Sequence, residues 1–283
     1  MTTVSADGSG IDVVMRCRNE MPHVERALEA LRRQSGPPLR VLFVDCRSTD
    51  GSREAAARAG VRIHDWNPRA YVPGVVLNTA MRMTSSEVVA FINADAVALH
   101  EDAVAQLVAP LLEGSDVAAT WGRQMPRPDA DPWTRADYLR AFPAGAPLQT
   151  RFGRLFSMAA SAVRRSAWEQ LEFDPHLRYS EDVDWTKRIG ALGWRLVYVP
   201  RARFEHSHAY DLRGHYRRRA GEGEADARIH HLGPPSVVTD LVRPLTGSVL
   251  RDVRAAALQP RSVAARVAQA AGYYAGRRRG ARP

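Results

Sequence analysis

The sequence predicts an α/β fold in which a mainly parallel β-sheet is flanked by helices and followed by a helical tail. Three observations support this prediction. Short apolar runs rich in β-branched residues alternate with amphipathic segments from the N-terminus onward. The first of these runs end in polar clusters, as strands do at the ligand-binding edge of an open sheet. The 283 residues are 45% apolar and 25% charged, which excludes a mainly disordered chain and suits one large domain or two fused halves.

The first half of the chain alternates between strands and helices. Runs 11–15 and 39–44 are predicted strands, and residues 22–34 between them carry Val24, Leu28 and Leu31 at helical spacing. Further helices are expected at 52–59, 75–83 and 101–112, and further strands at 61–64, 88–92 and 117–121. Because helices connect successive strands, both faces of the sheet should be covered.

The second half has weaker patterns. Five prolines between Met125 and Pro147 predict a loop-rich segment that covers the substrate. Helices are expected at 133–140, 166–171 and 181–192, and strands at 156–163 and 195–199. A tail begins after Gly233, and its apolar positions at helical spacing are Val263, Val267, Ala270 and Tyr274.

The positive charge is concentrated in that tail. The whole chain has a formal charge of +9, and Lys187 is its only lysine. Residues 234–283 hold nine arginines and two aspartates, a net charge of +7, which leaves +2 for the preceding 233 residues. A nearly neutral body does not support nucleic-acid binding, and we expect no nucleic-acid partner.

The cysteine content and the lengths of the apolar runs indicate where in the cell the protein is expected. Cys17 and Cys46 are too few for a disulfide framework or a four-ligand structural zinc site, and they suit a reducing cytoplasm. The first ten residues lack the features of a signal peptide, and no apolar run approaches the ~18 residues of a membrane span. We therefore expect a cytoplasmic protein, either soluble or peripheral at the inner face of the membrane.

Polar clusters follow the first two strands. Arg18, Asn19 and Glu20 come after strand 11–15, and residues 45–52 begin with Asp45 at the end of strand 39–44. Ser52 is expected only to cap the next helix. Asp45 ends a buried strand, where a carboxylate can accept hydrogen bonds from a nucleoside.

Two further clusters offer metal ligands. Asn93 and Asp95 follow strand 88–92, so Asp95 places a hard oxygen ligand for Mg²⁺ or Mn²⁺ at the sheet edge. A lone acid in such a loop is more often a helix cap. His206 and His208 follow strand 195–199 and could contact a metal or a phosphate, although a lone histidine is usually structural.

An acidic helix start is the fourth cluster. Ser180 is a predicted N-cap, and acids in the first turn stabilise the helix dipole by roughly 0.3–1 kcal/mol. The helical period, however, puts Glu181 and Asp182 on either side of the inward stripe that contains Trp185. Two inward carboxylates are costly unless they meet a cation, a metal or a substrate, so a functional role is favoured.

These pieces, in this order, resemble the inverting family 2 glycosyltransferases of the GT-A fold. The resemblance runs from Ile11 to His208 and includes Asn93-Ala94-Asp95 in the place of the Asp-x-Asp motif and the Glu181-Asp182-x-x-Trp185 helix. Asn78 in a Gly-x-x-x-Asn stretch belongs to the same pattern. Residues 72–80, 121–124 and 180–182 are similar to those of bacterial rhamnosyltransferase-like enzymes.

The resemblance implies a role for each cluster. Donor-binding residues would be Arg18, Asn19, Glu20, Asp45, Asn78, Asn93 and Asp95. Asp95 and His206 would hold a divalent cation, Mg²⁺ or Mn²⁺, on the donor diphosphate. Asp182 would be the general base, with Glu181 as the second candidate. Trp185, His208 and Arg123 would be additional contacts, for example with the acceptor.

The implied reaction is transfer of a sugar from dTDP-rhamnose or a UDP-hexose to a hydroxyl group of a glycan, glycolipid or natural product. Three positions depart from the family pattern: Cys46 replaces a second Asp, Asn93 replaces an acid, and Leu77 replaces an arginine. Arg69 or Arg123 would compensate for the missing arginine. The implied domains are a nucleotide-sugar-binding half (1–124), an acceptor-binding and catalytic half (125–233) and a basic helical tail (234–283).

Three alternatives were weighed. A nucleotidyltransferase would carry a Gly-rich basic loop after the first strand, and a dehydrogenase would carry Gly-x-Gly-x-x-Gly; neither motif is present. A non-catalytic relative that binds sugar nucleotides agrees with the changes at Cys46 and Asn93, but Glu181 and Asp182 argue against it. The tail either docks on the body or contacts an anionic membrane.

Overall fold

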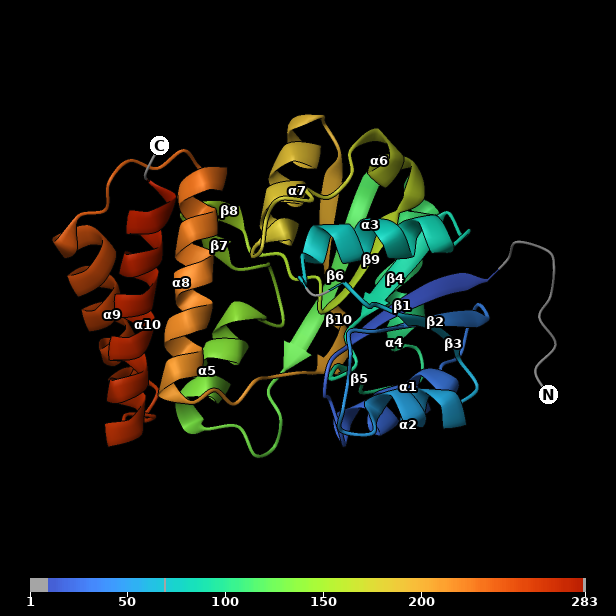
Figure 1. Ribbon diagram of the computed structural model, residues 1–283, viewed down its shortest axis with the longest axis horizontal. Helices are drawn as coiled ribbons and strands as arrows, with labels where there is room; N and C mark the ends of the chain where they lie inside the picture. The colour runs from blue at the N-terminus through green and yellow to red at the C-terminus, as the bar shows by residue number, and fades with distance from the viewer. Residues whose placement is uncertain (1–9, 69, 282–283) are drawn as a thin grey trace.

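The computed structural model describes residues 10–68 and 70–281 (Figure 1). These residues form an eight-stranded sheet in the order β3-β2-β1-β4-β9-β6-β10-β5, and a separate two-stranded ribbon, β7-β8. Strand β9 is antiparallel to both of its neighbours, and β5 is antiparallel to β10, whereas the remaining pairs are parallel. The predicted mainly parallel α/β sheet is confirmed.

The strands of the large sheet follow the apolar runs of the sequence. Their bounds are β1 Ile11–Cys17, β2 Leu39–Asp45, β3 Arg62–Asp65, β4 Val88–Ile92, β5 Val97–Ala98, β6 Val117–Met125, β9 Ala160–Arg164 and β10 Arg195–Glu205. The ribbon strands are β7 Gln149–Thr150 and β8 Gly153–Arg154. The strand expected at 156–163 is shorter than predicted, and the strand expected at 195–199 is longer.

Helices cover both faces of the sheet (Figure 1). Helices α1 (His23–Arg32), α2 (Ser52–Arg58) and α4 (Ala103–Glu113) bury one apolar cluster against it. Helices α3 (Pro73–Met83), α6 (Arg165–Gln170) and α7 (Glu181–Ala191) bury a second cluster on the opposite face. Helix α5 (Pro132–Ala141) lies in the proline-rich segment, where a helix was expected.

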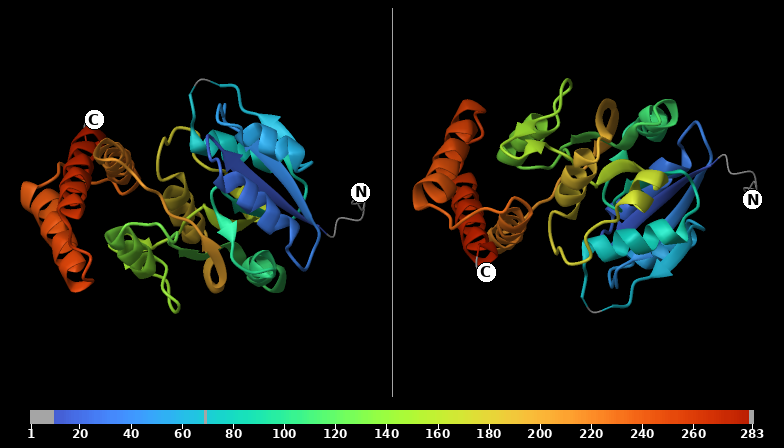
Figure 2. Two further views of the ribbon diagram at one scale, coloured as in Figure 1. Left: turned by 90° about the horizontal axis from the view of Figure 1, so that it is seen from below. Right: turned by 90° about the horizontal axis from the view of Figure 1, so that it is seen from above.

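Residues 212–281 form a group of helices, here called the helical end. It lies on the side of the molecule away from strands β1 to β3 (Figure 2). It contains α8 Leu212–Ile229, the π-helix η1 Val238–Val242, α9 Arg243–Arg254 and α10 Pro260–Gly280. Helix α8 was not predicted. None of the helices in the described ranges is long and apolar enough to cross a membrane.

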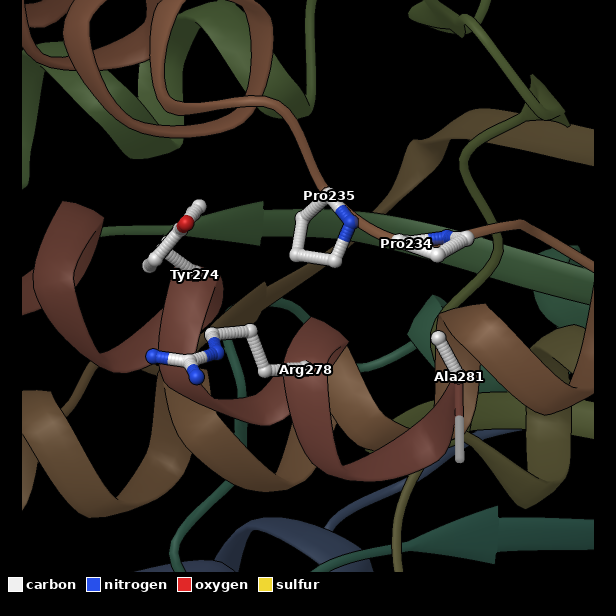
Figure 3. A pocket seen from close by; sticks show the side chains of 5 residues that line it. All are labelled: Pro234, Pro235, Tyr274, Arg278 and Ala281. Atoms are coloured by element: carbon white, nitrogen blue, oxygen red, sulfur yellow. The ribbon is translucent and has the colours of Figure 1, made fainter. Parts of the chain in front are cut away.

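Small residues let α8 and α10 approach each other closely. A methyl group at Gly272 would overlap with the carbonyl oxygen of Tyr216, and one at Gly276 would overlap with that of Ala220. The tail helix is therefore docked on α8, which precedes the tail. The linker crosses α10 at Pro234 and Pro235, and a pocket of about 220 Å³ lies between these prolines and α10 (Figure 3).

Two of the nine tail arginines are buried in ion pairs. Arg266 meets Asp252 and Asp137, each with a shortest distance of 2.6 Å, and Arg277 meets Asp240 at 2.8 Å. These two cations stabilise the helical end itself. The surface charge of the tail is thus smaller than its composition suggests.

Candidate active site

The carboxyl ends of five parallel strands gather the predicted site residues. Strands β1, β2, β4, β6 and β10 run in one direction, so the loops after them meet at one edge of the sheet. Residues 18–20, 46–51, 93–95 and 206–208 lie in these loops, and Asp45 is the last residue of β2. This arrangement agrees with the ligand-binding edge that the strand pattern predicted.

Asp95, His206 and His208 form a candidate metal centre. Their potential ligand atoms all lie within 4.8 Å of one another. His206 Nε2 is 3.4 Å from Asp95 Oδ2, and His208 Nδ1 is 3.6 Å from the same oxygen. His206 directly follows β10, because this strand continues past Pro200 to Glu205. One carboxylate and two imidazoles suit a divalent transition metal such as Mn²⁺.

A second layer of hydrogen bonds orients His206. Its Nδ1 lies 2.7 Å from Gln124 Oε1, and Gln124 donates through Nε2 to Ser157 Oγ at 2.7 Å. Because the Gln124 amide donates to Ser157, its oxygen faces the histidine and accepts the proton on Nδ1. His206 Nε2 then carries a lone pair and is buried without a hydrogen-bond partner among the residues that the structure describes. A buried unpaired nitrogen beside a carboxylate fits a metal ion.

The groups around Asp95 keep its carboxyl group ionised. Burial alone would raise the pKa of Asp95, but His206, His208 and Arg127 hold it well below its usual range. Burial and the neighbouring His206 lower the pKa of His208 to about 3. Arg127 donates to Asp95 Oδ2 at 3.1 Å, so a cation already neutralises this carboxylate. A metal ion would compete with Arg127 or share the carboxylate with it.

Glu181 and Asp182 begin helix α7 and face the same edge. Glu181 Oε1 is 3.5 Å from Arg16 on β1. Asp182 accepts hydrogen bonds from the backbone N–H groups of Met158 at 3.2 Å and Val183 at 2.9 Å. Arg16 is thus the cation that two inward carboxylates require.

The two carboxyls hold protons more tightly than usual. Burial raises the pKa of Glu181 and of Asp182, and for Glu181 the adjacent Asp182 adds to the rise. Arg16 opposes the shift of both groups. A carboxyl group with a raised pKa is a stronger base once ionised, which suits proton removal from a hydroxyl group near neutral pH.

Arg16 also links the acid pair to the metal side. Its guanidinium donates to Asn93 Oδ1 at 3.3 Å and to the Tyr71 hydroxyl at 3.2 Å. Asn93 is two residues before Asp95. An aspartate in place of Asn93 would be a further charged partner for Arg16, whereas the neutral amide leaves Glu181 as the carboxylate that pairs with it.

Asp45 offers an unpaired acceptor on the nucleoside side. Its Oδ2 accepts from the backbone N–H groups of Arg47 and Ser48, both at 3.1 Å, which closes a tight Asx turn. Its Oδ1 is buried and has no hydrogen-bond partner within residues 10–68 and 70–281. This free oxygen supports the predicted contact with a nucleoside.

The other residues of the first loop have different surroundings. Asn19 accepts from the Thr49 N–H at 2.8 Å and therefore ties the loops after β1 and β2 together. Burial, with a smaller effect of the Asp95 charge, raises the pKa of Glu20 to about 7. Arg18 is exposed in the same loop. Asn19 has a structural role, while Glu20 and Arg18 stay available for a ligand.

Three predicted contacts are weakened. Trp185 is fully buried, donates to the Leu171 carbonyl and packs on Phe173, which removes the support for an acceptor contact. Asn78 is buried too, and its amide bonds to Trp168 and Phe173, which removes the support for a donor contact. Arg123 donates to the Phe142 carbonyl at 3.0 Å, and Arg69 lies outside the described residues.

Sequence reasoning missed Arg16 and Arg127 as site residues. Arg16 had a detectable signal, since it is a charged residue that directly follows the apolar run Val13 to Met15 near the end of β1. Arg127 lies between two prolines in an irregular segment and reaches Asp95 across 32 positions of the chain. No local pattern indicates that pairing.

The comparison with protein families decides what kind of chain this is. The family model described as Glycosyl transferase family 2 matches residues 12–171, more than half of the sequence. The chain belongs to glycosyl transferase family 2. This family match extends over the strands that supply Asp45 and Asp95 and ends before the Glu181-Asp182 helix.

Curated relatives of this family 2 chain include rhamnosyltransferases. It is 28% identical over 204 residues to the O-antigen chain rhamnosyltransferase WbaN of Salmonella anatum, with 67% of this chain and 63% of that protein covered. It is 29% identical over 234 residues to the N-acetylglucosaminyl-diphospho-decaprenol L-rhamnosyltransferase of Mycobacterium tuberculosis, with 67% and 73% covered. The chain thus spans less than two thirds of the length of the Salmonella relative.

Solved structures support the GT-A fold. The mannosyltransferase PcManGT from Pyrobaculum calidifontis, in complex with GDP-Man and Mn²⁺, matches with a TM-score of 0.66 at 21% identity, covering 94% of this chain and 85% of that one. Glucosyl-3-phosphoglycerate synthase from M. tuberculosis, with Mn²⁺, UDP-glucose and phosphoglyceric acid, matches with a TM-score of 0.57 at 21% identity, covering 79% and 80%. The predicted fold class is confirmed.

Proposed function

We propose that this protein is an inverting glycosyltransferase that moves a sugar from a nucleoside-diphosphate donor to a hydroxyl group of an acceptor. The relatives named rhamnosyltransferases favour dTDP-rhamnose as the donor, with UDP-hexoses next, and a glycan, glycolipid or natural product as the acceptor. One observation carries the proposal: a metal-ligand set and a pair of carboxyls lie at one strand edge and are joined through Arg16 and Asn93.

The donor nucleoside would lie at Asp45. Its unpaired Oδ1 can accept a hydrogen bond from the base or from a ribose hydroxyl group. Arg18 and Glu20, in the loop after β1, would contact the donor from the side of the diphosphate. Asn93 would orient Arg16 toward the acid pair.

Asp95, His206 and His208 would hold the divalent cation, and Mn²⁺ is favoured over Mg²⁺ because two of the three ligands are imidazoles. When bound, the cation would offset the charge that builds on the departing diphosphate. Two solved structures similar to this chain, PcManGT and glucosyl-3-phosphoglycerate synthase, hold Mn²⁺ together with a nucleotide sugar.

Asp182 would take the proton of the acceptor hydroxyl group. Glu181 is held by Arg16, whereas Asp182 is held only by backbone N–H groups and is the less buried of the two. Glu181 stays the second candidate for the base. A single in-line displacement by the activated hydroxyl group would invert the anomeric carbon.

A donor screen tests the proposal. The full chain with Mn²⁺ is incubated with dTDP-rhamnose, UDP-hexoses, UDP-N-acetylhexosamines and GDP-mannose, and both nucleoside-diphosphate release and thermal stabilisation are measured. We expect one donor to stabilise the protein and to be turned over. Stabilisation by a donor without release, in the presence of varied acceptors, would support the non-catalytic relative instead; no effect of any donor would contradict both.

For the tail we propose peripheral contact with an anionic membrane, which would bring a lipid-linked acceptor to the site. The exposed side chains of Val242, Leu250 and Val253 lie on one face of the helix that runs from η1 into α9, and Arg243 and Arg254 flank it. Each arginine near an anionic surface contributes about 1 kcal/mol. In this proposal the protein works at the inner face of the membrane.

Liposome flotation tests the membrane contact. Truncation at residue 233 would expose the face of α8 that packs on α10, so surface variants are the better probe. We expect Val242→Asp/Val253→Asp to lose binding to vesicles rich in anionic lipid, while the control Leu112→Asp, at an exposed position on α4, keeps it. Equal flotation of both variants would contradict the membrane contact.

The division of the chain into three functional segments is also part of the proposal. Residues 1–124 would bind the donor, and residues 125–233 would supply the base and the acceptor contacts. Residues 234–283 would form the basic tail. Helix α8 belongs to the second segment but packs on the tail helix, so the second and third segments share one helical layer.

A further inference from the structure

A pocket of about 480 Å³ lies between the segment that leads into α7 and one side of α8, from Tyr216 to Arg228. One wall comes from residues 176–179 and the other from α8, with Arg279 of α10 at one end. The relevant lining residues are His176, Arg178, Tyr179, Tyr216, Arg217 and Glu224. None of them belongs to the candidate metal centre or to the acid pair.

The pocket has an excess of positive charge. Four arginines line it, Arg178, Arg217, Arg228 and Arg279, against a single glutamate, Glu224. Glu224 is already paired with Arg228 at 2.8 Å and with Arg279 at 3.1 Å. Within residues 10–68 and 70–281, no hydrogen bond or ion pair engages the side chain of Arg178 or of Arg217. Two free guanidinium groups in one pocket fit the oxygens of a phosphate or diphosphate.

Two aromatic rings line the same pocket. Tyr179 and Tyr216 are 41% and 39% exposed, so their rings are accessible to a ligand in the pocket. The Tyr179 ring lies against Gly221 of α8, where any larger residue would overlap with it. The glycine therefore shapes the pocket wall. Aromatic faces beside cations suit a sugar that is linked to an anionic group.

The pocket lies next to the proposed base. Tyr179 is two residues before Glu181, so their Cα atoms are at most ~7 Å apart along the chain. A ligand with its charged group at Arg178 and Arg217 would place its sugar on the side of the segment that leads into the acid pair. This placement suits an acceptor better than a donor, because the Asp45 and Asp95 loops are already assigned to the donor.

We propose that this pocket is an acceptor subsite that binds the diphosphate group of a diphosphate-linked glycan. The inference rests on the proposed glycosyl transfer and deepens it by naming the substrate class. A relative named for an N-acetylglucosaminyl-diphospho-decaprenol acceptor agrees with it. The same chemistry could come from a lipid-anchored or a soluble diphosphate, and the experiment below separates these sources.

The experiment compares two soluble probes, octyl N-acetylglucosaminyl diphosphate and octyl N-acetylglucosaminide, which differ only in the diphosphate. Their binding to the full chain is measured by calorimetry, with EDTA present so that the donor metal centre does not contribute. The variant is Arg178→Ala/Arg217→Ala. The control is Arg33→Ala/Arg201→Ala, which removes two exposed arginines elsewhere. Donor stabilisation is measured for every variant to separate this subsite from the donor site.

We expect the diphosphate probe to bind at least tenfold more tightly than the uncharged probe. The pocket variant should lose about 100-fold, equal to tenfold or 1.4 kcal/mol for each arginine, and the control should lose almost nothing. Donor stabilisation should be unchanged in all variants. Equal binding of both probes, or equal losses in variant and control, would overturn the subsite even if donor turnover upholds the glycosyltransferase.

A second arm identifies the source of the diphosphate. The diphosphate headgroup is presented either on neutral vesicles, through a polyprenyl chain, or as the soluble octyl probe. Tighter binding to the vesicles, lost in Arg178→Ala/Arg217→Ala, would support the subsite and a lipid-anchored acceptor. Equal affinity, lost in the same variant, would support the subsite and a soluble acceptor. If Arg178→Ala/Arg217→Ala binds the vesicle form and the soluble form as tightly as the unchanged protein does, the result contradicts the subsite.

Discussion

Two buried arginines show how the sheet edge differs from the helical end. Arg266 in α10 binds Asp252 through Nε and NH2 at 2.9 and 2.6 Å, and Asp137 through NH1 at 2.6 Å. Arg16 in β1 meets Glu181 at 3.5 Å and shares its other contacts with two neutral groups, Asn93 and Tyr71. All three guanidinium nitrogens of Arg266 therefore have a close carboxylate partner, whereas Arg16 meets a carboxylate only at the longer distance.

The difference separates a structural ion pair from a functional one. A carboxylate in a short bidentate pair is locked in its charged form and contributes to holding helices together. A carboxylate at a longer distance from its cation, and beside a second acid, keeps a raised pKa and can exchange a proton. The Arg266–Asp252 pair thus has a structural role, and the Arg16–Glu181 pair belongs to the candidate active site.

A large effect on turnover is expected at the metal centre. His206→Ala removes the unpaired buried nitrogen, and we expect Mn²⁺-dependent turnover to fall by at least 100-fold, because changes in a metal shell typically cost 10–100-fold even at its outer layer. Nucleoside-diphosphate release at increasing Mn²⁺ measures this. The conservative variant Gln124→Glu should retain Mn²⁺ binding. An unchanged Mn²⁺ requirement in His206→Ala would place the metal elsewhere.

The next effect concerns the stability of the fold, and the rate of sugar transfer by the folded protein should not change. Arg266→Met leaves Asp252 buried without its cation and should lower the free energy of unfolding by about 3–5 kcal/mol. Urea denaturation measures the loss. The double variant Arg266→Met/Asp252→Leu should recover most of it, because no unpaired charge is left. A loss below about 1 kcal/mol in the single variant would mean that this pair is not part of the scaffold.

A smaller effect is expected at Arg16, and it should depend on pH. The Arg16 cation lowers the pKa of Glu181 and Asp182, so Arg16→Gln should raise both further. The base works ionised, and activity is lost as pH falls through its pKa; the acidic limb should therefore move to higher pH. We expect turnover about tenfold lower at pH 7 and nearly restored at pH 9. A uniform loss at all pH values would indicate a merely structural role.

The sequence predicts the sheet better than the helical end, for a physical reason. Strands β1 and β4 are fully apolar on at least one face, and β2 holds the apolar run Val41 to Val44; such runs are visible locally. Helix α8 has no apolar stripe, since its inner face consists of small residues such as Ala220 and Gly223 that let α10 approach. Only the partner helix reveals why those positions are small.

Strand β10 illustrates a second limit. Pro200 and two arginines after it suggest an end at Val199, but a register shift between Val199 and Arg203 lets the strand continue to Glu205. This extension brings His206 directly to Asp95. The sequence could place Asp95 and His206 at strand ends, whereas their pairing with each other, and that of Arg16 with Glu181, depends on the tertiary fold.

Turnover by Asp182→Asn tests the central claim most directly, namely that Asp182, next to the Arg16-paired Glu181 at the start of α7, removes the acceptor proton. Nucleoside-diphosphate release is measured with the donor found in the screen, and thermal stabilisation by the same donor is measured in parallel. We expect release to fall by about 10²–10⁴-fold while donor stabilisation persists, because only general-base catalysis is removed. Full turnover in Asp182→Asn would contradict the account.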